Sequence, residues 1–386
     1  MSSAPDWQHG LRRSLGVIFW NPSLTLSISM ILSARVAVLT FIQRRTALTL
    51  AGAAFRRPLR LLIPTSGALG LTAVLCACGA FQKADAFAKS TNNLAAQPPI
   101  MWSSVLEFLN TLVALFFSEE PQANQRSMTF LPIAGMSCFL PIVFKQTFTI
   151  YTFAVLLPYT VLKSKLQWLL AFILASYWVG SWAWYSLSGL ALAEFAVVYK
   201  PHLPSAGVPL DRKGTRCMPL WIIAALFAAL GLLLKLLWAS LPQNRNGEYI
   251  LHVDRSDGTL NQGFQPQLSP YPRIDDYLLA IGFMMLVESV QPVRRLMENR
   301  LILFFGRICF PLFLTSGCIC LAFGSFLADY LTTKGWQPTP ESAKSLSVLF
   351  LACVPLCIIF AALAHWAVDQ PSMWVARKLF SFMIEP

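Results

Sequence analysis

Three arginines, Arg56, Arg57 and Arg60, stand directly before an apolar stretch that begins at Leu61. Arginine carries a permanent positive charge and forked donors that suit phosphate and carboxylate groups. Basic residues at the end of an apolar segment also mark the cytoplasmic side of a membrane protein. The three arginines therefore favour an anion-binding site, a topology signal, or both at once.

Further charged residues fall inside apolar stretches, where a charge is costly and is by default a candidate for function. A long side chain such as that of Lys235 can reach the membrane surface, and Glu194 and Glu288 lie near the ends of their stretches. A structural role is therefore favoured for these three, and the others are equally open to either role. The whole set is Arg35, Lys145, Glu194, Lys235, Glu288 and Arg307.

The elements that must position these residues are apolar helices. Of the 386 residues, 56% are hydrophobic and 12% are charged, whereas a soluble domain carries about 25% charged residues. Stretches as long as a membrane span, about 20 apolar residues, recur along the chain. The sequence therefore predicts an all-α, polytopic transmembrane helix bundle of about nine spans. The predicted spans are residues 24–43, 61–81, 139–162, 167–184, 185–198, 219–240, 277–293, 301–328 and 346–368.

The positive charge of the chain fits the same interpretation. A net charge of +12 would suggest nucleic acid as a partner of a soluble protein, but no basic patch lies on a soluble domain here, so the expected partner is the lipid bilayer and not nucleic acid. If the segment after the first span is cytoplasmic, the inside segments are shorter and carry more Lys and Arg than the outside ones. We therefore expect an integral, multi-pass protein with its C-terminus in the cytosol and its N-terminus on the opposite side.

Two loops and the cysteines complete the expected organisation. Residues 241–276 are rich in Pro, Gly, Asn and Asp and predict an irregular outer loop, and residues 101–118 are apolar and predict a segment that lies in the interface or dips into the bundle. All nine cysteines except Cys217 lie in apolar stretches, and none has the spacing of a zinc site. We expect no structural disulfide and no metal site.

Three parts of the chain carry a resemblance to a known family. In their order and spacing, the chain from about residue 24 resembles the integral membrane acyltransferase type 3 family, and most of all its fungal members. The resemblance implies one integral membrane acyltransferase-like domain over residues 1–386, and transfer of an acyl group, commonly acetyl from acyl-CoA, to a hydroxyl. The parts are "ILSARVAVLTFIQRRTALTLAGAAFRRPLRLLIP" (31–64), "FLPIVFKQTFTIYTFAVLLPY" (139–159), and the pair "FFGRICFPLFLTSG" (304–317) and "HWAVDQPSMWVARKL" (365–379).

The resemblance also implies where acyl-CoA binds and where this chain departs from the family. The arginine-rich stretch, here Arg56, Arg57 and Arg60, is linked to binding of acyl-CoA as a co-substrate, and no bound cofactor is expected. The family begins with a further span that bears a histidine, the general base, and no such span is recognised here. The other departures are Val143 in place of Glu, Gln146 and Thr147 in place of Gly-Ser, Ser316 in place of His, and Ser33-Ala34 at the helix end where the family has Ser-Gly.

An acyl transfer needs the hydroxyl proton removed and the developing oxyanion stabilised. His365 is the histidine that lies in a membrane segment and is the candidate base, although a helix-end histidine that faces lipid headgroups is the blander interpretation. His9 lies in a polar stretch and is not a convincing substitute. Lys145 and Arg307 are candidates to stabilise negative charge. We list all three of His365, Lys145 and Arg307 as candidate catalytic residues.

The leading interpretation is a membrane-bound O-acyltransferase that acts on a hydroxyl of a small, apolar metabolite, as in secondary metabolite biosynthesis. A non-catalytic or truncated relative is one alternative, motivated by the missing histidine and by Val143 and Ser316. A transporter is the other alternative, motivated by the buried charges, although no inverted repeat or pair of broken helices is recognised.

Overall fold

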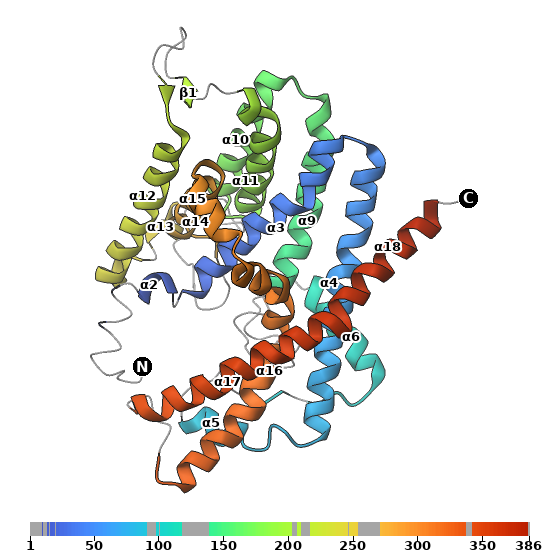
Figure 1. Cartoon of the computed structure of the whole chain (residues 1–386), viewed down its shortest axis with the longest axis vertical. Helices are drawn as coiled ribbons and strands as arrows, with labels where there is room; N and C mark the ends of the chain where they lie inside the picture. Colours follow the sequence, from blue (N-terminus) through green and yellow to red (C-terminus); the bar gives the residue numbers. More distant parts are fainter. Residues whose placement is uncertain are drawn as a thin grey trace. The chain divides into compact units, whose positions relative to one another are not determined.

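The computed structural model is built almost entirely of helices (Figure 1). In the part of the chain that it describes, the exception is a short antiparallel pair of strands, β1 (Val208–Pro209) and β2 (Cys217–Met218). The predicted all-α fold is therefore confirmed. The described residues are 10, 14, 16–19, 21–90, 98–99, 101–117, 139–202, 207–209, 217–245, 247–253, 271–336 and 342–384.

The helices differ widely in length. The longer ones are α3 (Pro22–Arg44), α4 (Ala47–Ala77), α6 (Val105–Phe117), α9 (Phe139–Leu156), α10 (Leu162–Trp178), α11 (Ala183–Glu194), α12 (Leu220–Ser240), α14 (Ile274–Ser289), α16 (Arg300–Thr333), α17 (Ala343–Ala364) and α18 (Gln370–Ile384). The shorter ones are α2 (Gly16–Phe19), α5 (Ala84–Ser90), η3 (Leu157–Tyr159), η4 (Phe195–Tyr199), η5 (Lys200–His202), η6 (Pro242–Asn244), α13 (Gly247–Ile250), α15 (Gln291–Met297) and η7 (His365–Asp369).

Six helices in the described ranges are long and apolar enough to cross a membrane. Each of them covers all or most of one predicted span, so their length and apolar composition support the expectation of a multi-pass membrane protein. The six helices are Ser23–Arg44, Ala47–Ala77, Leu140–Tyr159, Leu220–Ser240, Arg300–Thr333 and Ala343–Ile384.

The other three predicted spans do not coincide with single helices of spanning length, so the predicted total of nine spans is not confirmed. Residues 167–184 and 185–198 fall on α10, which has 17 residues, and on the short apolar helix Ala183–Tyr199. Residues 277–293 fall on α14 and α15, which meet at a bend of 103° and together make at most a seventh span. The bend has a local cause, because Val290 is extended and a proline follows in the first turn of α15.

The chain divides into two compact units, which we describe separately. Unit 1 comprises Met1–Gln8, Phe55–Phe144 and Arg300–Pro386, and unit 2 comprises His9–Ala54 and Lys145–Asn299. The expectation of one domain over residues 1–386 remains a prediction.

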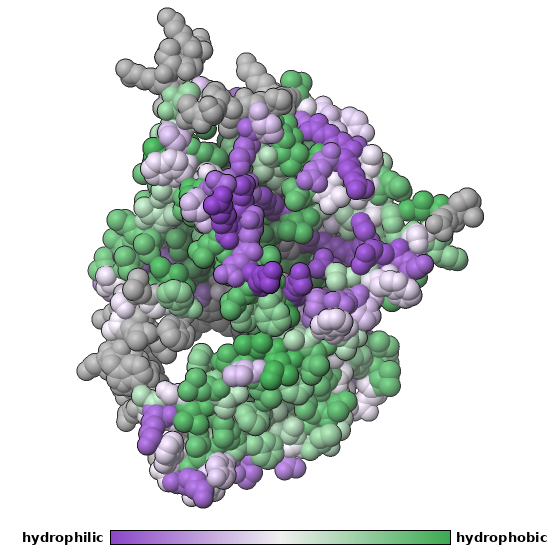
Figure 2. Space-filling model, viewed as in Figure 1, coloured by the Kyte–Doolittle hydropathy of each residue, from purple (hydrophilic) through white to green (hydrophobic). Residues whose placement is uncertain are grey.

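In unit 1, α4, α6 and α16 share an apolar core. Its buried members include Leu69 of α4, Phe116 of α6 and Leu314 of α16. The lower part of Figure 2, where α16 and α17 lie, shows mostly apolar side chains on the surface. With 31 residues, α4 is about 46 Å long and exceeds the hydrocarbon thickness of about 30 Å. The turns of α4 that carry the three arginines can therefore extend beyond the lipid tails.

In unit 2, α12 and α14 pack backbone to backbone through two glycines. A Cβ atom on Gly231 would clash with the backbone of Leu279, and one on Gly282 would clash with the backbone of Ala228. Small residues permit this close approach between apolar helices. Since Lys235 lies one turn after Gly231 on the same face of α12, the close packing directs it toward the beginning of α14.

Candidate functional site

In unit 1, the predicted base His365 has a carboxylate partner. The Nδ1 atom of His365 lies 2.8 Å from Oδ2 of Asp369, one turn further along η7, and both side chains are buried. The turn is a π-helical insertion between α17 and α18, a feature that is frequent at functional sites. With its Nδ1–H given to the carboxylate, the imidazole presents Nε2 as a base, 3.4 Å from the Gln370 amide nitrogen. The geometry suits general acid–base chemistry.

Helix α4, which carries the three arginines, runs along α18 and η7. The guanidinium of Arg56 lies 5.9 Å from the ring centroid of Phe380 on α18, and the Phe55 ring packs against the same phenylalanine. Further along α4, Gly67 lies against Val368 of η7, which a Cβ atom would approach to 3.1 Å. The predicted acyl-CoA arginines and the predicted base are thus carried by adjoining helices of one unit.

Arg60 is exposed on α4. The helix that carries it meets η7, which holds the His365–Asp369 pair, at Gly67 and Val368.

The other predicted residues lie elsewhere on the helices. Arg57 is half-buried on α4 and takes part in a contact of its own. Arg307 is exposed on α16 and forms no hydrogen bond or ion pair with another described residue. Lys145 is half-buried on α9 and belongs to unit 2. Ser316, which stands in place of the family's His, accepts a hydrogen bond from Cys357 through its backbone carbonyl.

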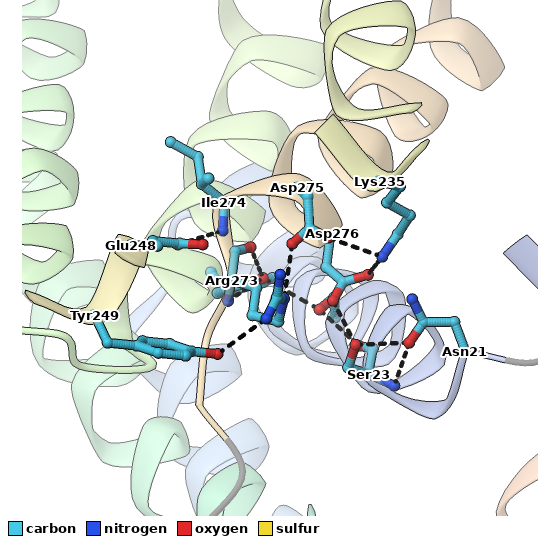
Figure 3. A network of polar contacts seen from close by, with 11 residues as sticks. Asn21, Ser23, Lys235, Glu248, Tyr249, Arg273, Ile274, Asp275 and Asp276 are labelled. Carbon is cyan, nitrogen blue, oxygen red and sulfur yellow. Dashed lines mark hydrogen bonds and ion pairs between the residues drawn. The ribbon is translucent and has the colours of Figure 1, made fainter. Parts of the chain in front are cut away.

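Unit 2 contains a buried ionic network that the sequence did not lead us to expect (Figure 3). Lys235 of α12 is 3% exposed and pairs with Asp275, at 3.2 Å, and with Asp276. Arg273 donates from Nε to Asp275 at 3.0 Å, and the Ser23 hydroxyl donates to Asp276. The expectation that Lys235 reaches the membrane surface is wrong, because the close packing of α12 on α14 brings two carboxylates to it.

Tyr185 of α11 holds the start of α14 in place. Its hydroxyl donates to the backbone carbonyl of Arg273 at 2.6 Å and lies 3.2 Å from the Arg273 backbone nitrogen. The Ser27 hydroxyl of α3 lies 3.2 Å from the same phenol oxygen. Two helices, α11 and α3, therefore fix the backbone from which the charged side chains of the network project.

Glu248 of α13 caps the start of α14 from outside the helix. Its Oε1 accepts from the backbone N–H of Ile274 at 2.7 Å, and its Oε2, although buried, has no hydrogen-bond partner among the described residues. The pKa of Glu248 is raised from an ordinary 4.5 to about 7, and burial is the largest cause. The carboxylates of Asp275 and Asp276 contribute to the rise, whereas the Ile274 N–H and the Arg273 charge oppose it.

His252 lies one turn beyond Glu248 and is 2% exposed. Its ring packs against Tyr177, with 5.0 Å between ring centroids. Burial lowers the pKa of His252, so the neutral imidazole is favoured there.

The remaining charges of the predicted spans are paired within unit 2. Arg35 and Lys200 both pair with Glu288. The carboxylate of Glu194 pairs with Lys165 at 3.3 Å and with Arg45 at 3.6 Å. A structural role, favoured from the sequence for the two glutamates, is consistent with these pairs.

Sequence reasoning missed Asp369, Arg273, Asp275, Asp276 and Glu248 as site residues. Residues 241–276 were expected to be an irregular loop, yet Ile274–Asp276 are helical and the two aspartates are buried, so the predicted span at 277 began three residues late. One signal was present. Lys235 and the aspartates lie at the same end of consecutive apolar helices, and a buried lysine needs a carboxylate partner.

Among the described residues, no group of three or more His, Cys, Asp or Glu side chains is placed to hold a metal ion. Comparison of the chain with protein-family models, with curated proteins and with solved structures gives no match.

Proposed function

We propose that the chain is a membrane-bound O-acyltransferase that moves an acyl group, most simply acetyl, from acyl-CoA to a hydroxyl of a small, apolar metabolite. The observation that carries the proposal is the buried His365–Asp369 pair on a helical segment that adjoins the arginine-bearing helix α4. A histidine oriented by a carboxylate is a general base, and arginines suit the phosphates of coenzyme A.

The proposed reaction assigns a role to each part. Nε2 of His365 takes the proton of the acceptor hydroxyl, and the hydroxyl oxygen attacks the thioester carbonyl. The C–S bond then breaks, and the coenzyme A thiolate receives the proton from His365. Asp369 is a positioning residue, because it holds the Nδ1–H and favours the imidazolium that forms between the two proton transfers. Arg56, Arg57 and Arg60 bind the phosphates.

The proposal includes a topology. The arginines of α4 and the C-terminal end of α18, with Arg377 and Lys378, lie on the cytosolic side, where acyl-CoA is supplied, and the N-terminus lies on the opposite side. Both helices contribute basic residues to adjoining segments of unit 1, which supports a common side for the two.

The first test is acyl-CoA binding to the purified protein. The wild type is compared with a triple variant, Arg56→Ala, Arg57→Ala and Arg60→Ala. A second triple variant, Arg294→Ala, Arg295→Ala and Arg300→Ala, removes the same charge from exposed positions elsewhere and is the matched control. We expect binding to vanish in the first variant and to persist in the second. If folded wild type does not bind acyl-CoA, the arginines act as topology signals and the acyltransferase proposal fails.

The second test addresses the chemistry. We expect His365→Gln to retain acyl-CoA binding and to lose release of the coenzyme A thiol by about 10²-fold or more, the usual contribution of a positioned base. If binding and thiol release are both unchanged in the variant, His365 is not the base. If wild type binds acyl-CoA but releases no thiol with any alcohol, the non-catalytic relative is favoured.

A separate observation favours transport as a second candidate. The buried Lys235–Asp275–Asp276 group joins two apolar helices, α12 and the bent helix α14, and ionisable groups in such positions often line ion or substrate pathways. Transport predicts flux of solute across vesicles that contain the purified chain and no acyl-CoA. Loss of this flux in a Lys235→Met variant would support it.

A further inference from the structure

The beginning of α14 has an unbalanced charge. In the network drawn in Figure 3 the cations are Lys235 and Arg273, and the carboxyl groups are Asp275, Asp276 and Glu248. Each aspartate has at least one ion pair with a cation, whereas Glu248 has a backbone N–H as its hydrogen-bond partner. The third carboxyl group is therefore the one for which the network provides no dedicated cation.

The position of Glu248 makes a charge there costly. Its side chain is 6% exposed, and its Oε2 meets no donor among the described residues. A buried carboxylate is strongly disfavoured when one of its oxygens has no hydrogen-bond donor. In the neutral carboxyl group the proton occupies that oxygen, so the oxygen needs no donor. The geometry thus provides a stable place for a proton on Glu248.

Among the described residues, no group around Glu248 forms an ion pair with it, and Arg273, whose charge lowers its pKa, is paired with Asp275. The neutral imidazole of His252 carries no charge, and the tyrosines lose their protons only at high pH. Arg245 lies at the exposed edge, where solvent screens it. The charged and titratable groups that face this region are Tyr177 of α10, Tyr185 of α11, Lys235 of α12, Arg245, Tyr249, His252, Arg273, and Asp275 and Asp276 of α14.

We infer that the Glu248 carboxyl group binds an exchangeable proton, and that release of this proton adds a third negative charge to a network that holds two cations. The ligand of the site is the proton itself. Its release turns the cap of α14 from a neutral acceptor into a carboxylate, at the point where α3, α11, α12 and α13 meet the helix. The inference does not depend on the acyltransferase proposal.

The pKa of about 7 places the exchange near neutral pH. It is tested by infrared spectroscopy of the full chain in lipid nanodiscs, with the C=O band of protonated carboxyl groups followed from about pH 5 to about pH 9. The wild type is compared with Glu248→Gln and with Glu298→Gln, which alters an exposed glutamate of the same unit. We expect a band that titrates near pH 7 in wild type and in Glu298→Gln, and that is missing from Glu248→Gln.

A second variant keeps the inference falsifiable if Glu248→Gln does not fold. Ile274 is the first residue of α14 and Arg273 before it is extended, so Ile274→Pro fits the backbone and removes the N–H that Glu248 accepts. Loss of this donor disfavours the carboxylate, so we expect the titration to move to higher pH by about half a unit or more. A wild type without a carboxyl band near pH 7, a band that survives in Glu248→Gln, or an Ile274→Pro variant with an unchanged midpoint would overturn the inference.

Discussion

Raising the pH through neutrality is expected to destabilise the folded chain through one carboxyl group. The pKa of Glu248 is raised by burial to about 7 in the folded state, from an ordinary value of 4.5. The folded state therefore holds this proton more tightly than the unfolded state does. The stabilisation that follows is fully present below about pH 4.5 and is lost as the pH rises through about 7.

The size of the effect follows from the same two values. The difference between about 7 and 4.5, at about 1.4 kcal/mol for each pH unit, corresponds to about 3 kcal/mol. This is a large part of the 5–15 kcal/mol by which a typical domain is stable, so the change lies well within reach of an unfolding experiment.

The assay is denaturant unfolding in detergent micelles, followed by tryptophan fluorescence at several pH values. Glutamine mimics the neutral carboxyl group, so Glu248→Gln should be less sensitive than wild type to a rise from about pH 5 to about pH 8, by about 3 kcal/mol. Glu298→Gln is the control and should follow wild type. A wild type and a Glu248→Gln variant with the same pH dependence of unfolding would refute the reasoning.

Three further predictions rest on other contacts. Lys235→Met leaves two buried aspartates without their lysine and should lower the free energy of unfolding by about 3–5 kcal/mol, as measured by thermal unfolding. A variant as stable as wild type would mean that the ion pairs are not formed. Gly189→Ala places a methyl group against the backbone of α3 and should cost about 1–3 kcal/mol, whereas Gly70→Ala, with open space around it, should not destabilise the chain. Asp369→Asn should retain acyl-CoA binding while thiol release falls by about 10²-fold or more, because the amide lacks the negative charge that favours the imidazolium and its NH₂ group can favour the wrong tautomer of His365. Unchanged thiol release would remove Asp369 from the mechanism.

Local composition was sufficient to predict the helices of spanning length. A run of about 20 apolar residues has no other stable conformation in lipid, because every backbone polar group must be satisfied within the segment. Six predicted spans therefore coincide with long helices. The prediction was not confirmed where a segment was short or broken, as in α10 and at the bend after Ser289, since a hydropathy window does not register a change of direction.

The candidate site residues also divide into those that the sequence could identify and those that required the tertiary structure. Arg56, Arg57, Arg60 and His365 stood out because charge and basicity are rare in apolar sequence. The partner of His365 was within reach of the sequence, because Asp369 lies four residues away, one helical turn along the chain.

The network around Lys235 depended on the tertiary structure. Its members come from helices that are far apart in the sequence, and they meet because Gly231 and Gly282 let two backbones touch. The burial of Glu248 likewise depends on the helices that surround α13, so its proton affinity could not be predicted from the residue type. Sequence by itself determined which segments are apolar enough for the membrane and which charges are exceptional there. Only the tertiary structure decided which charges are neutralised and which carboxyl group keeps a proton, because desolvation and Coulomb energy depend on distances between segments that the order of residues does not contain.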